Sequence, residues 1–309
     1  MMRAAGIERF GGDVRLLELA DPGAPGPDEV MISVRAAGVA NWDEFVRTGK
    51  WDVGRQPPMA LGVAAAGVVE SIGEDVSTLA AGDEVLTHPV PLRDQGAWAE
   101  RLVAPAAAVA PKPTGVAWNQ AAAFPVPALT ADQALAEVTP DPDGEWVLVH
   151  GAGGVTGGLL VQLAVARGAT VVATAGPSST TRVGAYGAHL VVDYHDPEWP
   201  LRVREASPSR RGVAAAVNAA PGGAALTLQA VADNGRLVTI TGDPPASERG
   251  IAVKDLYVRA DGAALALLAT ALEEGLLSVD VAAALPLTDA ATALDDALSG
   301  RRGAVVLVP

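Results

Sequence analysis

Residues 146–174, WVLVHGAGGVTGGLLVQLAVARGATVVAT, constrain the fold most. They predict a short apolar strand, a glycine-rich loop, an apolar helix, a turn at Gly168 and a second strand. Such a loop is typical of a domain that binds a dinucleotide, with the pyrophosphate held at the N-terminus of the helix. A tight strand-to-helix turn in other doubly wound folds also favours glycines. The loop therefore indicates dinucleotide binding only together with its flanking strands and helix.

The residues of this loop have separate expected roles. Gly151 would make the tight turn off the strand, and Gly153 would let the backbone approach the pyrophosphate. Thr156 stands where the third glycine of a GxGxxG pattern would permit close packing of helix and sheet. Either Gly157 takes that role or Thr156 adds a hydroxyl contact to phosphate. The candidate cofactor-binding residues of the loop are Gly151, Gly153, Gly154, Val155 and Thr156.

Two patterns divide the chain of 309 residues. The first hundred residues carry short β-like runs separated by Gly and Pro, which indicates an antiparallel β-rich domain. From Trp118 onward helices alternate with short strands, which predicts βαβ crossovers and a doubly wound parallel sheet. The fold class is therefore α/β. The expected boundaries are 1–117 for the β-rich domain, 118–259 for the dinucleotide-binding domain and 260–309 for a C-terminal segment.

The expected elements follow from these patterns. Strands of the β-rich domain are expected at 14–19, 30–37, 63–72, 84–87 and 97–103. Strands of the second domain are expected at 146–149, 170–174, 190–192, 213–217, 236–240 and 253–258. Its helices are expected at 128–138, 155–167, 179–186, 198–205 and 224–231. The C-terminal segment is expected to hold helices 262–274 and 288–298 and strands 281–285 and 304–308.

The residues after the strand 170–174 bear on the choice between NAD and NADP. An Asp or Glu would close that strand if the adenosine ribose carried a free 2′-hydroxyl, yet the first acidic residue after the loop is Asp193. The intervening hydroxyl groups and arginine suit a 2′-phosphate. We therefore expect NADP(H) as cofactor, bound by Gly176, Ser178, Ser179 and Arg182. The alternative is that residues 178–181 merely cap the next helix.

Two further strands end in candidate cofactor contacts. Asn218 and Ala219 follow one strand, and Thr241 and Gly242 follow the next. The carboxyl edge of a parallel sheet is where nucleotides bind. These four residues are therefore expected near the cofactor.

Composition excludes several classes of protein. The chain has 36 acidic and 22 basic residues, a formal charge of -14, which disfavours a nucleic acid partner. No apolar run approaches the length of a membrane span, and the start of the chain lacks the apolar run of a secretory signal. The absence of cysteine excludes disulfides, thiolate nucleophiles and Cys-ligated zinc. We expect a soluble, cytoplasmic protein with no membrane partner.

Segments along nearly the whole chain match, in order, the landmarks of a known family. They are VRAAGVANWDEFVRTG at 34–49, LGVAAAGVVESIG at 61–73, AGDEV at 81–85, AAAFPVPALTADQAL at 121–135, GAHLVVDY at 187–194, NGRLVTITG at 234–242 and the terminal GRRGAVVLVP. On these segments the chain resembles the medium-chain dehydrogenase/reductase superfamily, specifically its zinc-free quinone oxidoreductase (zeta-crystallin-like) branch.

The resemblance implies a GroES-like β-rich domain, a Rossmann domain, a C-terminal return to the first domain and an active site in the cleft between the domains. Zinc-dependent relatives hold their catalytic metal with a Cys before a WD-like Asp and with the His and Glu of a GHE segment. Here Ala40 and Asn41 precede Asp43, and neither His nor Glu follows Gly62. No metal site is therefore expected.

The resemblance also implies roles for residues of the first domain. Asn41 is the candidate catalytic residue, because the family carries an Asn in this turn and a developing enolate or phenolate oxygen needs a hydrogen-bond donor. Its alternative role is to satisfy the backbone of its own turn. Trp42, Phe45 and Trp51 are expected to line a pocket for a flat substrate, with core packing as the alternative for each of them.

Three residues of the second domain also resemble family positions. Thr130 resembles a Thr that lies beside the nicotinamide, with helix capping as its alternative. Tyr194 and Arg182 resemble positions that flank the adenosine phosphate in NADPH-binding members, and Tyr194 has surface packing as its alternative.

These observations favour a zinc-independent, NADPH-dependent oxidoreductase that transfers hydride to a quinone or an α,β-unsaturated carbonyl compound. One alternative is an enoyl-thioester reductase of fatty acid or polyketide type, and another is a catalytically weak, NADPH-binding regulatory protein. The family implies a homodimer in which strands such as Val253–Val258 pair across a twofold axis. The many Ala residues and the excess of Arg over Lys indicate a bacterial source.

Overall fold

The computed structural model describes residues 1–138, 145–300 and 302–309. The chain forms two compact units, one of residues 130–258 and one that joins residues 1–129 to 259–309. The first division falls inside helix α3 (Pro125–Val138), whereas the sequence places it before helix α2 (Trp118–Ala123). No helix in the described part of the chain is both long and apolar enough to cross a membrane.

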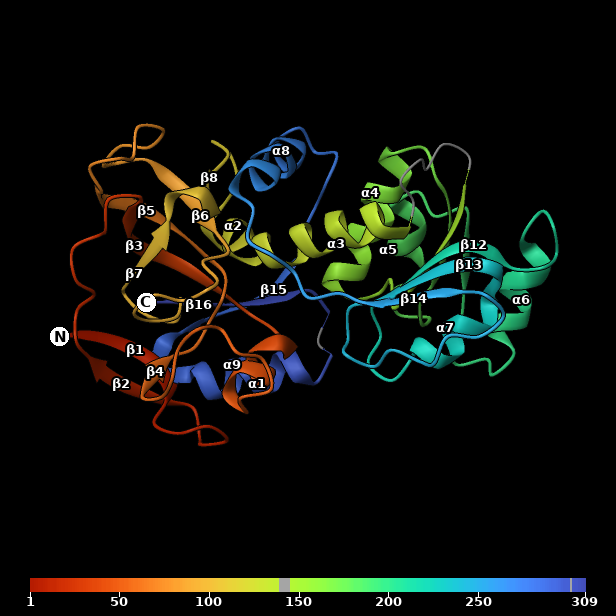
Figure 1. Ribbon diagram of the computed structural model, residues 1–309, viewed down its shortest axis with the longest axis horizontal. Helices are drawn as coiled ribbons and strands as arrows, with labels where there is room; N and C mark the ends of the chain where they lie inside the picture. Colours follow the sequence, from red (N-terminus) through yellow and green to blue (C-terminus); the bar gives the residue numbers. More distant parts are fainter. Residues whose placement is uncertain (139–144, 301) are drawn as a thin grey trace. The chain divides into compact units, whose positions relative to one another are not determined.

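The unit of residues 130–258 is built on a six-stranded parallel sheet (Figure 1). Its strands are β9 (Trp146–His150), β10 (Thr170–Thr174), β11 (Leu190–Val192), β12 (Val213–Asn218), β13 (Val231–Thr239) and β14 (Ala252–Asp255). Every neighbouring pair is parallel. Their spatial order is β11-β10-β9-β12-β13-β14, which is 3-2-1-4-5-6 in chain order. This order is that of a doubly wound dinucleotide-binding sheet, so the α/β prediction is confirmed.

Helices cover both faces of this sheet. Figure 1 shows α4 (Val155–Ala166) and α5 (Thr180–Ala185) on one face, and α6 (Trp199–Ala206) and α7 (Ala224–Ala230) on the other. Beneath α6 and α7 a buried apolar cluster joins the helices to the strands, and it includes Leu148, Val172, Trp199, Val203, Leu228 and Leu237. A sheet buried on both faces explains why its strands β9, β10 and β12 are almost uninterrupted apolar runs.

The other unit is rich in antiparallel strands. Its larger sheet has seven strands in the order β15-β16-β3-β5-β6-β8, with β7 also paired to β3, and its smaller sheet has the order β2-β1-β4. The strands are β1 (Met2–Ile7), β2 (Arg15–Leu19), β3 (Glu29–Val39), β4 (Met59–Ala60), β5 (Ala65–Ile72), β6 (Glu84–Thr87), β7 (Arg101–Pro105), β8 (Val109–Pro111), β15 (Val281–Pro286) and β16 (Ala304–Val308).

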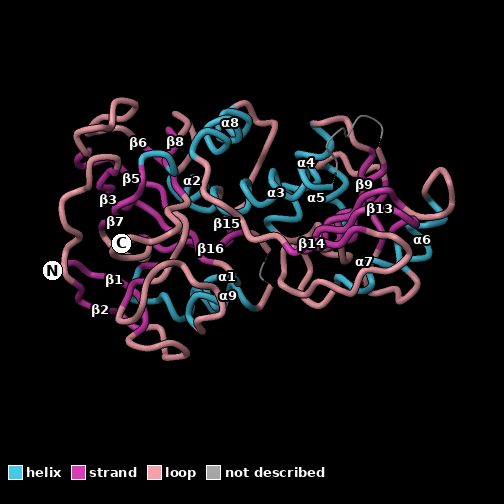
Figure 2. Tube along the Cα trace, viewed as in Figure 1, coloured by secondary structure: helices cyan, strands magenta, loops and turns pink. Residues whose placement is uncertain are grey.

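The C-terminal segment completes this β-rich unit. Strand β16 pairs antiparallel with β3, with Val305 opposite Val39, and β15 then pairs parallel with β16. Figure 2 shows the helices of the unit among and around its strands, with α2 packed against the larger sheet. They are α1 (Asn41–Arg47), α2, α8 (Gly262–Glu273) and α9 (Ala290–Leu298), with 3-10 turns at Ala106–Ala108 and Leu287–Asp289.

Strand β13 begins earlier than the sequence predicts, directly at the end of α7. The sequence predicts this strand to begin at Arg236, but the structure begins it at Val231. No loop residue separates Ala230 from Val231, so the last carbonyl groups of α7 need partners from elsewhere.

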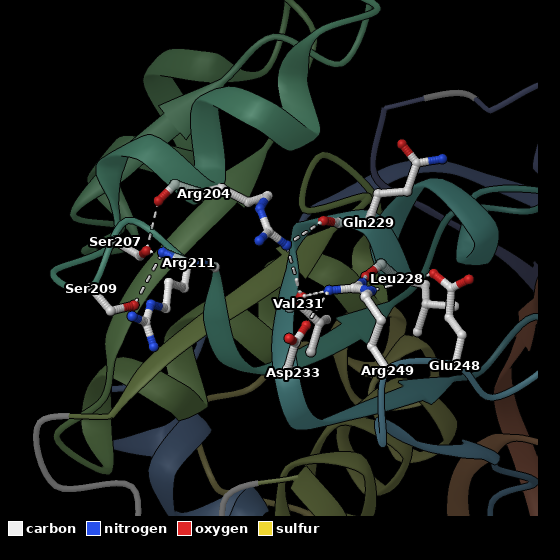
Figure 3. Close-up of polar contacts among 11 residues, drawn as sticks. Arg204, Ser207, Ser209, Arg211, Leu228, Gln229, Val231, Asp233, Glu248 and Arg249 are labelled. Atoms are coloured by element: carbon white, nitrogen blue, oxygen red, sulfur yellow. Dashed lines mark hydrogen bonds and ion pairs between the residues drawn. The ribbon is translucent and has the colours of Figure 1, made fainter.

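Two arginine side chains supply those partners, as Figure 3 shows. Arg249 donates hydrogen bonds to the carbonyl oxygens of Leu228 at 2.6 Å and Val231 at 2.8 Å. Arg204 donates to the carbonyl oxygens of Gln229 at 3.1 Å and Val231 at 3.2 Å. Cations at a helix C-terminus also stabilise the helix dipole. Arg249 holds this position with a φ of 52°, in the left-handed region that disfavours a side chain.

Candidate functional site

The glycine loop between β9 and α4 leaves no room for side chains at its first turn. Gly151 has a φ of 87°, and a Cβ atom on it would lie 2.9 Å from the carbonyl carbon of Ala219. Ala219 directly follows β12, so two strand ends meet backbone to backbone at this point. Glycine is required here both by its conformation and by this contact.

Gly157 is the glycine that packs helix against strand. A Cβ atom on Gly157 would lie 2.1 Å from the carbonyl oxygen of Gly151. Of the two alternatives left open by the sequence, the packing role therefore falls to Gly157. Thr156 is half-buried in the first turn of α4 and lies outside that contact. Gly151 and Gly157 are therefore the two glycines of the loop that this contact requires.

The N-terminus of α4 is suited to an anion. The helix begins at Val155 after Gly154, no side chain caps it, and its first turn carries no acidic residue. Its first backbone N–H groups and the positive end of its dipole are therefore not neutralised by the chain itself. A helix N-terminus preceded by glycines, whose backbone a ligand can approach closely, fits a pyrophosphate.

The segment after β10 lies against this loop. A Cβ atom on Gly153 would lie 2.7 Å from the Oγ atom of Ser179, and the Arg182 guanidinium donates a 2.8 Å hydrogen bond to the carbonyl oxygen of Gly153. A Cβ atom on Gly176 would lie 3.3 Å from the ring of Tyr194. The structure therefore gathers these five candidate residues around one turn, whereas Ser178 is exposed beside it.

Tyr194 is accessible from solvent. Its side chain is 47% exposed and its ring stacks on that of His195, with the ring centroids 4.2 Å apart. His195 in turn lies 2.7 Å from the carboxylate of Asp193. The stacked rings of Tyr194 and His195 thus form an accessible aromatic surface beside Gly176, in the turn that follows β10.

A polar network occupies the carboxyl ends of β12 and β13, and it joins the predicted Asn218 and Thr241 to Thr239 and Asp243, which the sequence reasoning missed. The buried Asn218 amide donates to the Oγ1 atoms of Thr239 at 3.0 Å and Thr241 at 2.9 Å. Both threonine hydroxyls donate to the Oδ1 atom of Asp243, at 2.7 and 2.5 Å. Despite partial burial, these hydroxyl donors hold the pKa of Asp243 below its usual range. Gly242, between these residues, has a φ of 71°.

A second missed group joins the ends of β9 and β10. The Oγ1 atom of buried Thr174 accepts a 3.0 Å hydrogen bond from the N–H of Gly151 and shares one of 2.7 Å with the Nδ1 atom of His150. The His150 ring stacks on Trp199 at 4.6 Å. Burial lowers the pKa of His150 to about 4, although Asp243 opposes the shift, so the ring is neutral near pH 7.

The remaining candidate residue of this unit, Thr130, is buried in α3. The signal that could have revealed the missed residues is a polar residue at the end of each apolar strand. The missed residues Thr174 and Thr239 each occupy such a position, as does the predicted Asn218. They form the polar rim at the edge of the sheet where a nucleotide is expected.

In the β-rich unit, Asn41 is the first residue of α1. Its side chain is half-buried and makes no hydrogen bond to any residue that the structure describes. Its amide group therefore does not hold the turn through a side-chain hydrogen bond, and its catalytic role stays a prediction. The turn is held instead by Asp43, whose Oδ2 atom accepts a 2.9 Å hydrogen bond from the N–H of Ala40.

Asp43 is fully buried, and burial raises its pKa to about 8. The backbone groups of Ala40 and Gly62 offset only part of this shift. The carboxyl group is therefore predominantly protonated at neutral pH.

The three candidate pocket residues Trp42, Phe45 and Trp51 are all half-buried. Trp51 is tied to α1, because its N–H donates a 3.1 Å hydrogen bond to the carbonyl oxygen of Phe45. Partial burial distinguishes these rings from the core residue Trp98, which is fully buried. Large apolar rings that are neither fully packed nor fully exposed are typical of ligand-binding surfaces.

Across residues 1–138, 145–300 and 302–309, no three His, Cys, Asp or Glu side chains are grouped so that they could hold a metal ion.

Comparison with known proteins bears on the identity of both units. Residues 26–114 match the family model of the alcohol dehydrogenase GroES-like domain. Residues 186–307 match the family model described as zinc-binding dehydrogenase. The first model lies within the β-rich unit, whereas the second covers the later part of the unit of residues 130–258 and most of the C-terminal segment.

Individual relatives agree with these family models. The chain is 35% identical over 199 residues to a quinone oxidoreductase of Lama guanicoe, an alignment that covers 63% of this chain and 59% of the relative. The chain thus spans about three fifths of the length of that relative.

Solved structures match over the whole chain. One described as an NAD-dependent alcohol dehydrogenase is 29% identical, with a TM-score of 0.88 and 100% of both chains covered. A mycobacterial protein complexed with NADPH is 28% identical, with a TM-score of 0.85 and 100% of both chains covered. On its two domains, its sheet order and these relatives, the chain belongs to the medium-chain dehydrogenase/reductase superfamily, in the zeta-crystallin-like branch.

Proposed function

We propose that the protein is an NADPH-dependent, zinc-independent oxidoreductase that reduces a quinone or an α,β-unsaturated carbonyl compound. Its superfamily binds a nicotinamide cofactor. The observation that carries the proposal is the uncapped N-terminus of α4 behind a loop in which Gly151 and Gly157 admit no side chain. That geometry fits the pyrophosphate of a dinucleotide.

The preference for NADPH rests on the end of β10. In a protein that binds the free 2′-hydroxyl group of the adenosine ribose, an acidic side chain stands at the end of this strand. Here Thr174 ends the strand, and its hydroxyl is engaged by Gly151 and His150. The turn that follows offers Ser178 and Ser179 hydroxyls and no carboxylate to repel a phosphate.

Zinc independence rests on the residues at the positions where metal-dependent relatives carry ligands. Ala40 and Asn41 precede Asp43, and Val63 and Ala64 follow Gly62. None of these side chains offers a thiolate, imidazole or carboxylate to a metal, except the buried and protonated Asp43.

The reaction consumes one hydride and one proton for each quinone that becomes a hydroquinone. NADPH, when bound, supplies the hydride. The chain must hold the acceptor flat and stabilise the oxygen that becomes negative as the hydride arrives. Trp42, Phe45 and Trp51 offer aromatic faces for the first task. The Asn41 amide offers an N–H donor for the second.

A homodimer through the edge strand β14 belongs to the same proposal. Strand β14 ends the six-stranded sheet, so its outer edge has unpaired backbone groups. Tyr257, two residues beyond it, is 57% exposed. Light scattering in solution that gives the mass of a single chain would refute this part.

The experiment that tests the function titrates NADPH and NADH into the purified protein and then adds 1,4-benzoquinone or an enone. We expect tight binding of NADPH, weaker binding of NADH and loss of the reduced-nicotinamide absorbance when the acceptor is added. Binding without turnover across a panel of acceptors would favour a regulatory protein instead. Failure to bind either nucleotide would overturn the cofactor assignment.

A further inference from the structure

His88 is a fully buried histidine of the β-rich unit with one unused nitrogen. It directly follows β6, and its Nδ1 atom lies 2.7 Å from the carbonyl oxygen of Val63. A carbonyl oxygen only accepts hydrogen bonds, so Nδ1 carries the ring proton. Burial lowers the pKa of His88, so the ring stays neutral and Nε2 keeps its lone pair.

This lone pair has no hydrogen-bond donor. The Nε2 atom is buried and has no partner among the residues that the structure describes. Leaving a buried acceptor unpaired destabilises the fold, so such an atom calls for a group that the chain itself does not supply.

The surroundings of His88 connect it to the residues already assigned to the substrate. Its ring centroid lies 6.3 Å from that of Trp51, one of the three half-buried aromatic residues. Its anchor, Val63, stands in the segment where metal-dependent relatives carry a ligand. The imidazole therefore lies next to the proposed substrate surface.

A second buried atom without a partner lies by the same segment. Asp43, whose pKa is influenced by the backbone of Gly62, has an Oδ1 atom with no hydrogen bond of good geometry. Two buried polar atoms without partners thus adjoin the consecutive residues Gly62 and Val63. The unprotonated Nε2 atom can only accept a hydrogen bond, and a hydroxyl group is a donor that a substrate can supply.

We propose that the Nε2 atom of His88 accepts a hydrogen bond from a hydroxyl substituent of the substrate, so that the enzyme prefers hydroxyl-bearing quinones or enones. The inference rests on the proposed function and names its substrate class. Nε2 cannot bind the reacting carbonyl oxygen, because an unprotonated nitrogen repels a developing negative charge. The hydroxyl group in question is therefore a substituent and not the product of the reduction.

The matched substrates are 2-(hydroxymethyl)-1,4-benzoquinone and 2-methyl-1,4-benzoquinone, which differ by one oxygen atom. We expect kcat/KM of the wild type to favour the hydroxymethyl compound by at least about tenfold, because the methyl compound leaves Nε2 unpaired. Equal values for the two quinones would overturn the inference while leaving the proposed function intact. Turnover of neither would count against the proposed function.

Two substitutions separate contact from packing. H88N keeps a donor for the Val63 carbonyl but removes the acceptor at the Nε2 position, so the preference should disappear through a higher KM for the hydroxymethyl quinone. H88Q places an amide oxygen near the Nε2 position and should restore part of the preference. H189N, at an exposed histidine of the other unit, is the control and should change neither value. An equal loss for both quinones in H88N would indicate a structural role and overturn the inference.

A binding measurement tests the same contact without turnover. In protein labelled with nitrogen-15 at histidine, the His88 signals are assigned as those that H88N lacks. Benzyl alcohol should shift the Nε2 signal of His88, whereas toluene, which has no hydroxyl group, should not. If benzyl alcohol leaves that signal unchanged at saturating concentration, the inference is wrong whether or not the protein reduces quinones.

Discussion

The carbonyl oxygen of Gly151 lies 2.1 Å from the position that a Cβ atom would take on Gly157, so the end of β9 and the first turn of α4 touch backbone to backbone. This contact fixes where α4 begins relative to the sheet. It therefore also fixes the direction in which the first N–H groups of the helix point, which is the basis of the proposed cofactor site.

G157A should weaken both the fold and the cofactor site. The added methyl group cannot fit without moving backbone, a change that costs about 1–3 kcal/mol. We expect a lower midpoint of urea unfolding and a higher Kd for NADPH in titration. G184A is the control, because a Cβ atom on Gly184 meets nothing within 4 Å and alanine favours the helix. If G157A binds NADPH like the wild type, the packing contact does not position the site.

S178E should reduce affinity for NADPH much more than affinity for NADH. Ser178 is exposed in the turn after β10, so a carboxylate there is tolerated by the fold but repels a 2′-phosphate. We expect the Kd for NADPH to rise by about tenfold or more, which corresponds to roughly 1.4 kcal/mol. S178A should change it far less. Equal effects of S178E on both nucleotides would contradict the proposed 2′-phosphate contact.

His150 should make the protein lose stability in acid. Its pKa is about 4 in the fold against 6.5 unfolded, so the neutral ring contributes stability that is complete above pH 6.5. That contribution is lost as the pH falls from 6.5 through 4 and amounts to about 3 kcal/mol. Unfolding midpoints measured across this range should fall more steeply for the wild type than for H150N. A control variant, H189N, should keep the wild-type slope.

Asp43 should make the protein lose stability as the pH rises, which is the opposite of the effect of His150. Its pKa is about 8 in the fold against 3.8 unfolded, so the contribution of the protonated carboxyl is complete below pH 3.8 and is lost as the pH rises through 8. D43N keeps an oxygen for the Ala40 N–H and does not titrate. We expect its stability relative to the wild type to grow steadily as the pH is raised. A difference that is independent of pH would show that Asp43 is not protonated in the fold.

R249A should destabilise the end of α7 without touching the cofactor site. The Leu228 carbonyl loses its arginine donor and the Val231 carbonyl keeps only that of Arg204, at a cost of about 1–3 kcal/mol in unfolding free energy. The Kd for NADPH should not change. R210G is the matched control: Arg210 also has a positive φ, of 54°, but is exposed, so glycine should be neutral or slightly stabilising. Equal behaviour of the two variants would mean that the Arg249 hydrogen bonds contribute little.

The sequence predicts best those strands whose first and last residues are set by their own side chains and their immediate neighbours in the chain. The strands at 170–174, 190–192 and 304–308 have the predicted bounds because turn residues or a helix end flank each apolar run. Strand β1 was not predicted, because it forms only through pairing with β2 and β4. The early start of β13 depends on Arg249, which follows it in the chain and which no local pattern connects to α7.

The candidate site divides in the same way. The glycine loop and the turn after β10 are continuous in sequence, so their residues could be named from the motif. The Asn218–Asp243 network and the His150–Thr174 pair join different strands, and their hydrogen bonds exist only once the sheet order is known. His88 shows the limit most clearly, because only the folded chain reveals that one of its nitrogens has no partner.

The pairing of β16 with β3 has a consequence for how the protein is made. During synthesis, β3 leaves the ribosome long before β16. The backbone pairing of Val39 with Val305 can therefore form only after nearly the whole chain has been made. The residues of the parallel sheet are all translated within that interval, so the dinucleotide-binding unit is able to fold first. The β-rich unit, whose closing contacts span most of the sequence, should be the slow step in folding and the stage most exposed to aggregation.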